Sequence, residues 1–332
     1  MRIATYNVEW FNSLFDDAGA LIGGNSWSSR RDVTKEQQTQ ALGHVFKALD
    51  ADAVMVIEAP NTSRQRDGVR ALERFAAQFD LRARAALMGF ANDTQQEITL
   101  LYDPDVLTAR HDPQSGTTAP RFDTQFAIDL DVDAAPEVVT FSKPPLEVVL
   151  EATDFAFRMI GVHAKSKAPH GARTPDEVMR VSIANRRKQL AQCIWLRARV
   201  DAHLAAGNPL IVLGDFNDGP GLDEYEKLFG RSSVEIVLGQ GETALFDPHA
   251  RAALTQRIGA SPTSSRFFLK HENRYLQALL DYVMVSPRIM EHAPRWRIWH
   301  PFEDAGCFHM PELREALLLA SDHFPVTLDL SI

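Results

Sequence analysis

Residues 210–218 read LIVLGDFND, a run of apolar residues that passes directly into carboxylate and amide side chains. A continuous apolar run of this kind is typical of a strand that is buried on both faces of a sheet. Hydrophobic packing does not explain Asp215 and Asn217 at the end of such a strand. Functional sites are common at strand ends in α/β sheets, because the sheet is a rigid scaffold and the loops there are exposed to solvent. The stretch therefore predicts a central strand that delivers polar groups to a site.

The same pattern recurs outward along the chain, where short apolar runs end or open on polar residues. The runs are IATYNV (3–8), AVMVIE (53–58), ITLLY (98–102), FAIDLDV (126–132), LEVVL (146–150), FAFRMIGVH (155–163), LDYVMVS (280–286) and FPVTLDL (324–330). The polar residues at their ends are Asn7, Glu58, His163, Asp281, Asp322 and His323.

Helical spacing separates these strand candidates in three segments. Residues 33–49, 69–79 and 176–206 carry apolar residues at helical intervals, and Gly207-Asn208-Pro209 ends the longest of them. Many strands with few helices indicate two packed sheets flanked by helices. The sequence has no repeat, low-complexity tract or Gly/Ser linker, so we expect a single domain over residues 1–332.

Composition excludes several classes of protein. The 332 residues are 45% hydrophobic, which is an ordinary globular value and excludes a disordered or collagen-like chain. A net charge of −9 argues against a protein that coats duplex DNA through bulk charge, but it does not exclude a small basic cleft. Two cysteines form no disulfide framework, and no signal peptide or membrane span is evident. We expect a cytoplasmic protein.

The residue types at the strand ends fit one kind of chemistry. Asn, Asp and Glu offer the hard oxygen ligands that Mg²⁺ or Mn²⁺ prefers. Histidines beside such a metal can protonate a leaving group or hold a phosphoryl oxygen. Carboxylates with two histidines and no nucleophilic serine motif indicate metal-assisted hydrolysis of a phosphate ester by water.

The motifs TYNVEWF, VIEAP, GVHAKSK, LGDFND, LDYVMVS and SDHFPV, in this order, closely resemble those of the endonuclease/exonuclease/phosphatase (DNase I-like) superfamily. They run from residue 5 to residue 326, and LGDFND with SDHFPV is the most specific pair. The resemblance implies an α/β (α+β) fold, a four-layer α/β/β/α sandwich with two mixed β-sheets face to face and helices outside.

The resemblance also implies roles for single residues. Glu58 is expected to be the principal metal ligand, and Asp281 to fix the tautomer of His323 by a hydrogen bond. The expected metal-binding residues are Asn7, Glu58 and Asp322, with Mg²⁺ (or Mn²⁺) as the cofactor. The expected catalytic residues are His163, Asp215, Asn217, Asp281 and His323.

The chain departs from its relatives at two places. Ile57 stands where many relatives have Gln before the metal-binding Glu58. The stretch GVHAKSK, with its histidine, is less similar to abasic-site endonucleases than to DNase I, the phosphatases and bacterial secreted nucleases. The resemblance therefore disfavours abasic-site repair and leaves the other activities open.

Two segments offer candidate substrate contacts. In residues 163–188 bases outnumber acids, which is consistent with a solvated helix face or with a phosphate-facing patch, and Lys165 and Lys167 are the substrate-binding candidates. Residues 301–312 are a candidate rim loop that contributes to substrate choice.

We therefore expect a divalent-metal-dependent phosphohydrolase, with a phosphodiesterase or nuclease acting on DNA or RNA as the leading hypothesis. The alternative is a phosphatase or phosphodiesterase for a small-molecule or lipid phosphate, and a weaker one is a non-catalytic binding module on the same fold. The expected partner is a phosphate-ester substrate, with nucleic acid in a local cleft as one candidate. No protein partner is implied.

Overall fold

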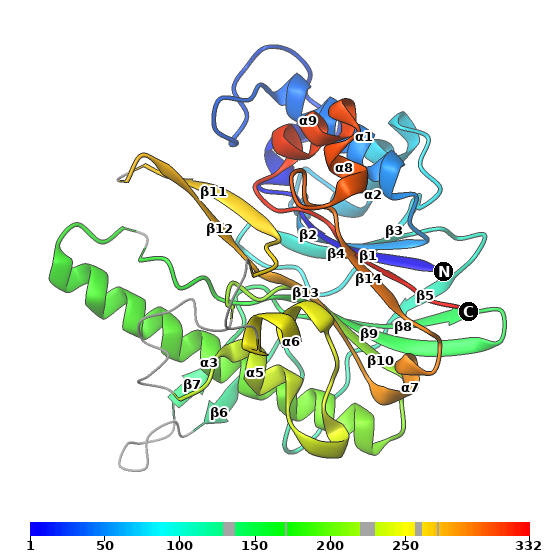
Figure 1. Cartoon of the computed structure of the whole chain (residues 1–332), viewed down its shortest axis with the longest axis vertical. Helices are drawn as coiled ribbons and strands as arrows, with labels where there is room; N and C mark the ends of the chain where they lie inside the picture. The colour runs from blue at the N-terminus through cyan, green and yellow to red at the C-terminus, as the bar shows by residue number, and fades with distance from the viewer. Residues whose placement is uncertain (129–136, 170, 220–229, 256–260, 271) are drawn as a thin grey trace.

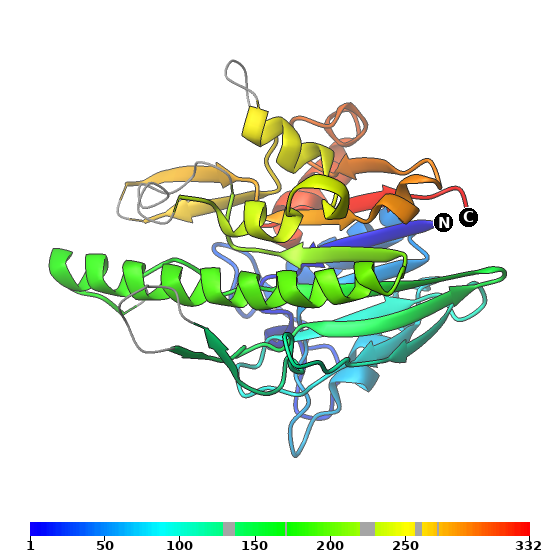
Figure 2. The same cartoon turned by 90° about the horizontal axis from the view of Figure 1, so that it is seen from below.

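Two β-sheets pack face to face in the computed structural model, and helices cover their outer faces (Figure 1). The structure describes residues 1–128, 137–169, 171–219, 230–255, 261–270 and 272–332. Helices α1, α2 and α9 lie together on one side of the molecule, and α3, α5 and α6 lie on the other. Figure 2 looks onto the second side, where the long helix α3 crosses in front of the sheets. The predicted sandwich of two mixed sheets with helices outside is confirmed.

The larger sheet contains both the first and the last strand of the chain. Its strands β1 and β2 are parallel, and every other neighbouring pair is antiparallel. The order is β14 (Arg295–Ile298), β15 (Val326–Asp329), β1 (Arg2–Asn7), β2 (Ala53–Ala59), β4 (Glu97–Tyr102) and β3 (Ala85–Met88).

The smaller sheet repeats this arrangement, because it too has one parallel pair, β9 and β10, among antiparallel neighbours. The order is β13 (Asp281–Val285), β10 (Leu210–Asp215), β9 (Phe155–His163), β8 (Leu146–Ala152) and β5 (Thr108–His111). Two hairpins stand apart from the sheets: β11 (Ser265–Leu269) with β12 (Arg274–Ala278), and β6 (Phe126–Ile128) with β7 (Glu137–Val139).

Helix boundaries follow local capping chemistry. Thr34 and Gln37 form a capping box at the start of α1, and Thr174 and Glu177 form another at the start of α3, which has Pro175 in its first turn. The helices are α1 (Lys35–Leu49), α2 (Gly68–Gln78), α3 (Pro175–Ala205), α5 (Ser233–Leu238), α6 (Pro248–Thr255), α7 (Pro287–Met290), α8 (Ala305–Phe308) and α9 (Pro311–Ala320), and short 3₁₀ turns span Phe11–Leu14 and Gly241–Thr243.

The central core lies between the two sheets. Ile3 and Met55 of the larger sheet and Met159 and Leu213 of the smaller sheet belong to one fully buried cluster. Gly161 of β9 allows the sheets to approach closely, because a Cβ atom there would lie 2.4 Å from the sulfur of Met55. Two further clusters pack the outer faces of the sheets against the helices. This inner face is the surface from which the candidate site is built.

Most predicted elements are present, with two differences. Only residues 126–128 of the predicted strand 126–132 are seen as β6, and the rest of that segment lies outside the described residues. The expected rim loop at 301–312 is wrong as a loop, because it contains α8 and the start of α9. The side chain of Asp304 caps α8 by accepting a hydrogen bond from the backbone N–H of Cys307, and Cys307 itself is buried. No helix in the described part of the chain is long and apolar enough to cross a membrane.

Candidate active site

The two parallel strand pairs deliver their carboxyl ends to one place. Asn7 ends β1, His163 ends β9 and Asp215 ends β10. Because β13 is antiparallel to β10, Asp281 opens it directly opposite Asp215. For the same reason the residues just before β15, which is antiparallel to β1, arrive at this end of the larger sheet. The topology therefore explains why residues from distant motifs converge.

Strand alternation turns the side chains inward, toward the space between the sheets. Asn7 lies an even number of positions from Ile3, and Asp215 lies two positions from Leu213, so each shares the face of an inner-core residue. The two sheets then meet through a buried hydrogen bond in which Asn7 Nδ2 donates to Asp215 Oδ2 at 3.0 Å. This bond brings the ends of the two strands into direct contact.

Glu58 reaches the site through an irregularity in β2. The pairing register of β2 shifts between Ile57 and Ala59, and Glu58 itself has a φ of 62°, a left-handed conformation that is uncommon for non-glycine residues. Bulges of this kind re-aim side chains next to active sites. The backbone N–H of Trp10 donates to Glu58 Oε2 at 2.8 Å, and Oε1 lies 4.0 Å from His163 Nε2. Burial raises the pKa of Glu58.

Asp215 is held in a fixed orientation by amide groups. Asn217, in a left-handed turn with a φ of 51°, donates its side-chain Nδ2–H to Asp215 Oδ2 at 3.1 Å and its backbone N–H to Oδ1 at 2.8 Å. Burial raises the pKa of Asp215 to about 7, although neighbouring His323 opposes the shift. The predicted pair Asp215 and Asn217 is therefore one hydrogen-bonded unit.

His323 and Asp281 form a carboxylate–histidine pair. His323 Nδ1 donates to Asp281 Oδ2 at 2.8 Å, and the same oxygen accepts from the hydroxyl of Ser264 at 2.7 Å. The bond leaves His323 Nε2 facing the centre of the site, 4.0 Å from an oxygen of Asp215 and 4.0 Å from an oxygen of Asp322. Burial disfavours the charged imidazole, but Asp281 and Asp215 outweigh it and hold the pKa of His323 well above its ordinary value.

His163 faces a lysine that the sequence motifs do not include. The ammonium Nζ of Lys143 lies 3.2 Å from both ring nitrogens of His163. Burial and the neighbouring Lys143 lower the pKa of His163 well below its ordinary value, and burial lowers the pKa of Lys143. The signal available in the sequence was Lys143-Pro144-Pro145 just before the strand run at 146–150. That signal fixes a local turn but gives no indication of the distant histidine.

The donor set fits a hard divalent cation. Oxygen ligands dominate the site, and Oδ1 of Asp281 is buried without a hydrogen-bond partner in the part of the chain that the structure describes. Ligand atoms of Asp215, Asp281 and His323 lie within 4.8 Å of one another, so this group is a possible metal-binding group. Glu58 and Asp322 add further carboxylates to the same site, since their charges influence each other.

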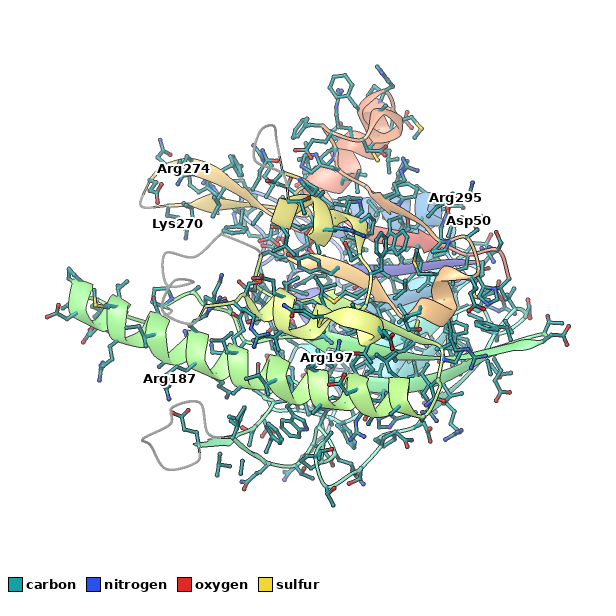
Figure 3. All side chains as sticks on the ribbon, turned by 60° about the horizontal axis from the view of Figure 1, so that its bottom comes forward. Asp50, Arg187, Arg197, Lys270, Arg274 and Arg295 are labelled. Atoms are coloured by element: carbon teal, nitrogen blue, oxygen red, sulfur yellow. The ribbon has the colours of Figure 1, made fainter. Side chains whose placement is uncertain are left out.

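The two candidate substrate lysines have different surroundings. Lys167 Nζ lies 2.7 Å from buried Asp218, which also binds Arg186 at 2.8 Å, so Lys167 is held in an ion-pair cluster. Lys165 is half-buried near Lys188, and burial and that neighbour lower its pKa. Figure 3 shows other basic residues farther out: Arg187 on α3, and Lys270 and Arg274 toward the outer end of the β11–β12 hairpin.

Comparison with known proteins identifies the class that this fold and site define. The model of the endonuclease/exonuclease/phosphatase family matches residues 4–323, so the chain belongs to this family. The chain is therefore a metal-dependent hydrolase of phosphate esters, as the buried acidic and histidine groups also indicate. No curated protein matches the chain significantly.

Solved structures share the fold at low sequence identity. A family protein from Bacteroides thetaiotaomicron is 14% identical with a TM-score of 0.50, covering 99% of this chain and 96% of its own. A mannosyl-6-phosphatase from the same organism is 15% identical with a TM-score of 0.50, and each chain is covered completely, at 100%. A humanised D. rerio TDP2 is 11% identical with a TM-score of 0.51, covering 99% of this chain and 97% of its own.

Proposed function

We propose that the chain is a phosphodiesterase that cleaves DNA or RNA with the help of Mg²⁺ or Mn²⁺. The observation that carries this proposal is that the two segments flanking the catalytic groups each carry a basic residue. Lys165 follows His163 by two residues at the end of β9. On the other side, the backbone N–H of Arg266 in β11 donates to the carbonyl oxygen of Asp322 at 2.6 Å, and the guanidinium of Arg266 lies over the ring of Tyr275. A polynucleotide carries phosphates on both sides of the scissile one, so this distribution of charge matches it.

Glu58, Asp322 and the amide oxygen of Asn7 would hold the metal ion. We assign Asp281 and His323 to hydrogen bonding instead, because their facing atoms already bind each other at 2.8 Å. The bound ion would supply stabilisation of the negative charge that develops on the phosphoryl oxygens. With the metal-binding role assigned to these residues, Asp215 and the two histidines are available to act on the attacking water and the substrate.

The remaining residues have roles that follow from their hydrogen bonds. Asp215, fixed by Asn7 and Asn217, orients the attacking water and accepts its proton. His323 holds a phosphoryl oxygen through Nε2–H, because Asp281 occupies Nδ1. An ammonium group can only donate, so the nitrogen of His163 that accepts from Lys143 leaves the proton on the other ring nitrogen. That N–H can donate to the phosphate or to the leaving oxygen.

A substrate panel tests the proposal. The purified chain is incubated with single-stranded DNA, RNA, plasmid DNA, a nitrophenyl phosphodiester, a nitrophenyl phosphomonoester, sugar phosphates and a sphingomyelin vesicle, each with Mg²⁺, Mn²⁺ or EDTA. We expect metal-dependent cleavage of the nucleic acids, with binding that weakens steeply as salt rises because counterions are released. Turnover of only the sugar phosphates or the lipid, with no steep salt dependence, would contradict a nuclease and favour the alternative.

A matched pair of variants checks that the cleavage belongs to this site. Glu58→Gln should reduce turnover by about 10²-fold or more, because the ligand loses its charge without losing its shape. Glu151→Gln makes the same chemical change at an exposed position of β8 and should leave turnover unchanged. Equal turnover by both variants would place the activity elsewhere.

A further inference from the structure

The segment that follows β1 holds a tryptophan backbone in a strained conformation beside Glu58. Trp10 has a φ of 59° and a ψ of 43°, and Glu9 before it also has a positive φ, of 26°. Bulky residues rarely adopt left-handed angles, and such strain persists only where the surroundings impose it. Here the Trp10 N–H donates to Glu58 Oε2 at 2.8 Å, so the strained backbone is part of the site.

The neighbours of Trp10 have buried or paired side chains, and Trp10 does not. Val8 and Phe11 are fully buried in the core. Glu9 binds Arg30 and accepts the backbone N–H of Asp322 at 3.0 Å. The side chain of Trp10 is 44% exposed. The bond to Glu58 therefore anchors the backbone of a residue whose side chain is partly exposed, next to a catalytic carboxylate.

Other tryptophans of the chain show what a structural role requires. Trp195, Trp296 and Trp299 each donate an indole N–H to a protein oxygen, namely Pro120 O at 2.9 Å, Val283 O at 2.7 Å and Thr327 Oγ1 at 3.0 Å. Within the described residues, the indole of Trp10 has no such bond and no aromatic or cationic partner. Trp27, which is 69% exposed, resembles it in exposure, but its backbone pairs with Thr34 in the segment just before α1.

We propose that the indole of Trp10 is the surface on which a nucleobase of the substrate stacks, next to the scissile phosphate. The inference rests on the proposed nuclease function and names the part of the substrate that this residue recognises. Every base presents a π-face, so stacking on an exposed aromatic ring gives affinity with little dependence on sequence. Because the backbone of Trp10 is bonded to Glu58, the stacked base and the scissile phosphate are held in a fixed relation.

The test compares two oligonucleotides of equal charge, an oligothymidylate and the same backbone carrying abasic tetrahydrofuran residues. Trp10→Gly removes the ring, keeps the N–H that Glu58 accepts and relieves the positive φ. We expect this variant to raise KM for the base-bearing strand by about tenfold, with kcat nearly unchanged, and to leave KM for the abasic strand unchanged. Trp10→Phe keeps a ring and should retain most of the affinity, and Trp27→Ala should behave like the wild type.

A second measurement does not depend on turnover. Binding of the oligothymidylate in EDTA should quench tryptophan emission in the wild type and in Trp27→Ala, and the quenching should be lost in Trp10→Phe. Unchanged thermal unfolding and an unchanged Mn²⁺ titration of Trp10→Gly would show that the fold and Glu58 are intact.

The outcomes separate the two proposals. Cleavage of oligonucleotides with equal effects of Trp10→Gly on both strands, or with no effect on either, overturns the stacking role and leaves the nuclease function standing. Absence of both oligonucleotide cleavage and quenching, together with turnover of a small phosphate ester, overturns both.

Discussion

The two histidines of the site lie a few ångströms from the same carboxylate but in opposite electrostatic surroundings. His163 Nε2 is 3.7 Å from Asp215 Oδ2, and His323 Nε2 is 4.0 Å from the same oxygen. Burial, reinforced by Lys143, lowers the pKa of His163, whereas Asp281 and Asp215 outweigh burial and raise the pKa of His323. Burial lowers the pKa of both histidines, so the carboxylates around His323 account for the opposite direction of its shift. Two residues of one type can therefore do different work in one site.

Removing either histidine should give the largest effects. We expect His163→Gln and His323→Gln each to reduce kcat on an oligonucleotide by about 10²-fold to 10⁴-fold, since each removes a positioned donor. A nitrophenolate leaving group needs no proton, so the loss in His163→Gln should shrink on a nitrophenyl phosphodiester, while the loss in His323→Gln should not. His44→Gln, at an exposed position of α1, is the control and should have no effect. Identical behaviour of the two site variants on both substrates would remove the distinction between the histidines.

Changing Lys143 tests the cationic half of the comparison and should have a smaller effect. Lys143→Met removes the donor beside His163, and we expect a fall in kcat of about 10-fold to 10²-fold, whereas Lys143→Arg should retain most of the activity. Lys47→Met, at an exposed position of α1, is the matched control. The deciding measurement is kcat on the oligonucleotide, and full activity of Lys143→Met would show that His163 does not need this neighbour.

The smallest predicted effect is on the stability of the fold and concerns Glu97. This buried carboxyl is not one of the catalytic groups, so it can be compared with the buried carboxyls of the site. Burial raises its pKa to about 7, against the bonds that it accepts from Asn92. The folded state favours the protonated form, so the stabilisation is complete below the unfolded pKa and is lost as pH rises through about 7. Glu97→Gln should therefore have a free energy of unfolding about 1–3 kcal/mol higher than the wild type at pH 8, and little different from it at pH 4.

Urea unfolding of wild type and Glu97→Gln at both pH values measures this difference, with Glu151→Gln as the exposed control. A stability difference that stays constant between the two pH values would mean that folding does not shift the pKa of Glu97.

The sequence predicts the strands and the convergence of the site because both follow from local patterns. Apolar runs define β1, β9 and β10, and the polar residues at their ends mark the edge where parallel strands meet. The position of Lys143 against His163 is not predictable in this way, because it depends on the packing of residues far apart in the chain. The direction of the Glu58 side chain is also not predictable from the sequence, because the alternation of side chains between the two faces of β2 is interrupted at the bulge.

The segments that were missed or misassigned are those with weak periodic signals. The strands of the hairpin β11–β12, SRFFL and RYLQA, show no regular alternation of polar and apolar residues, and cross-strand contacts such as Arg266 against the ring of Tyr275 at 3.5 Å support their pairing. The stretch 301–312 reads as a loop because α8 is only four residues long and depends on capping by Asp304.

The pairing of β1 with β15 has a consequence for how activity is acquired during folding. The first strand bonds to a strand more than three hundred residues later in the chain, as in the pair Ile3 and Leu328. Asp322 and His323 precede that last strand, so they reach the other catalytic groups only when it docks. Contacts of such long sequence separation form slowly. Hydrolysis therefore requires a docked β15, and we expect turnover in a refolding experiment to appear no earlier than this pairing.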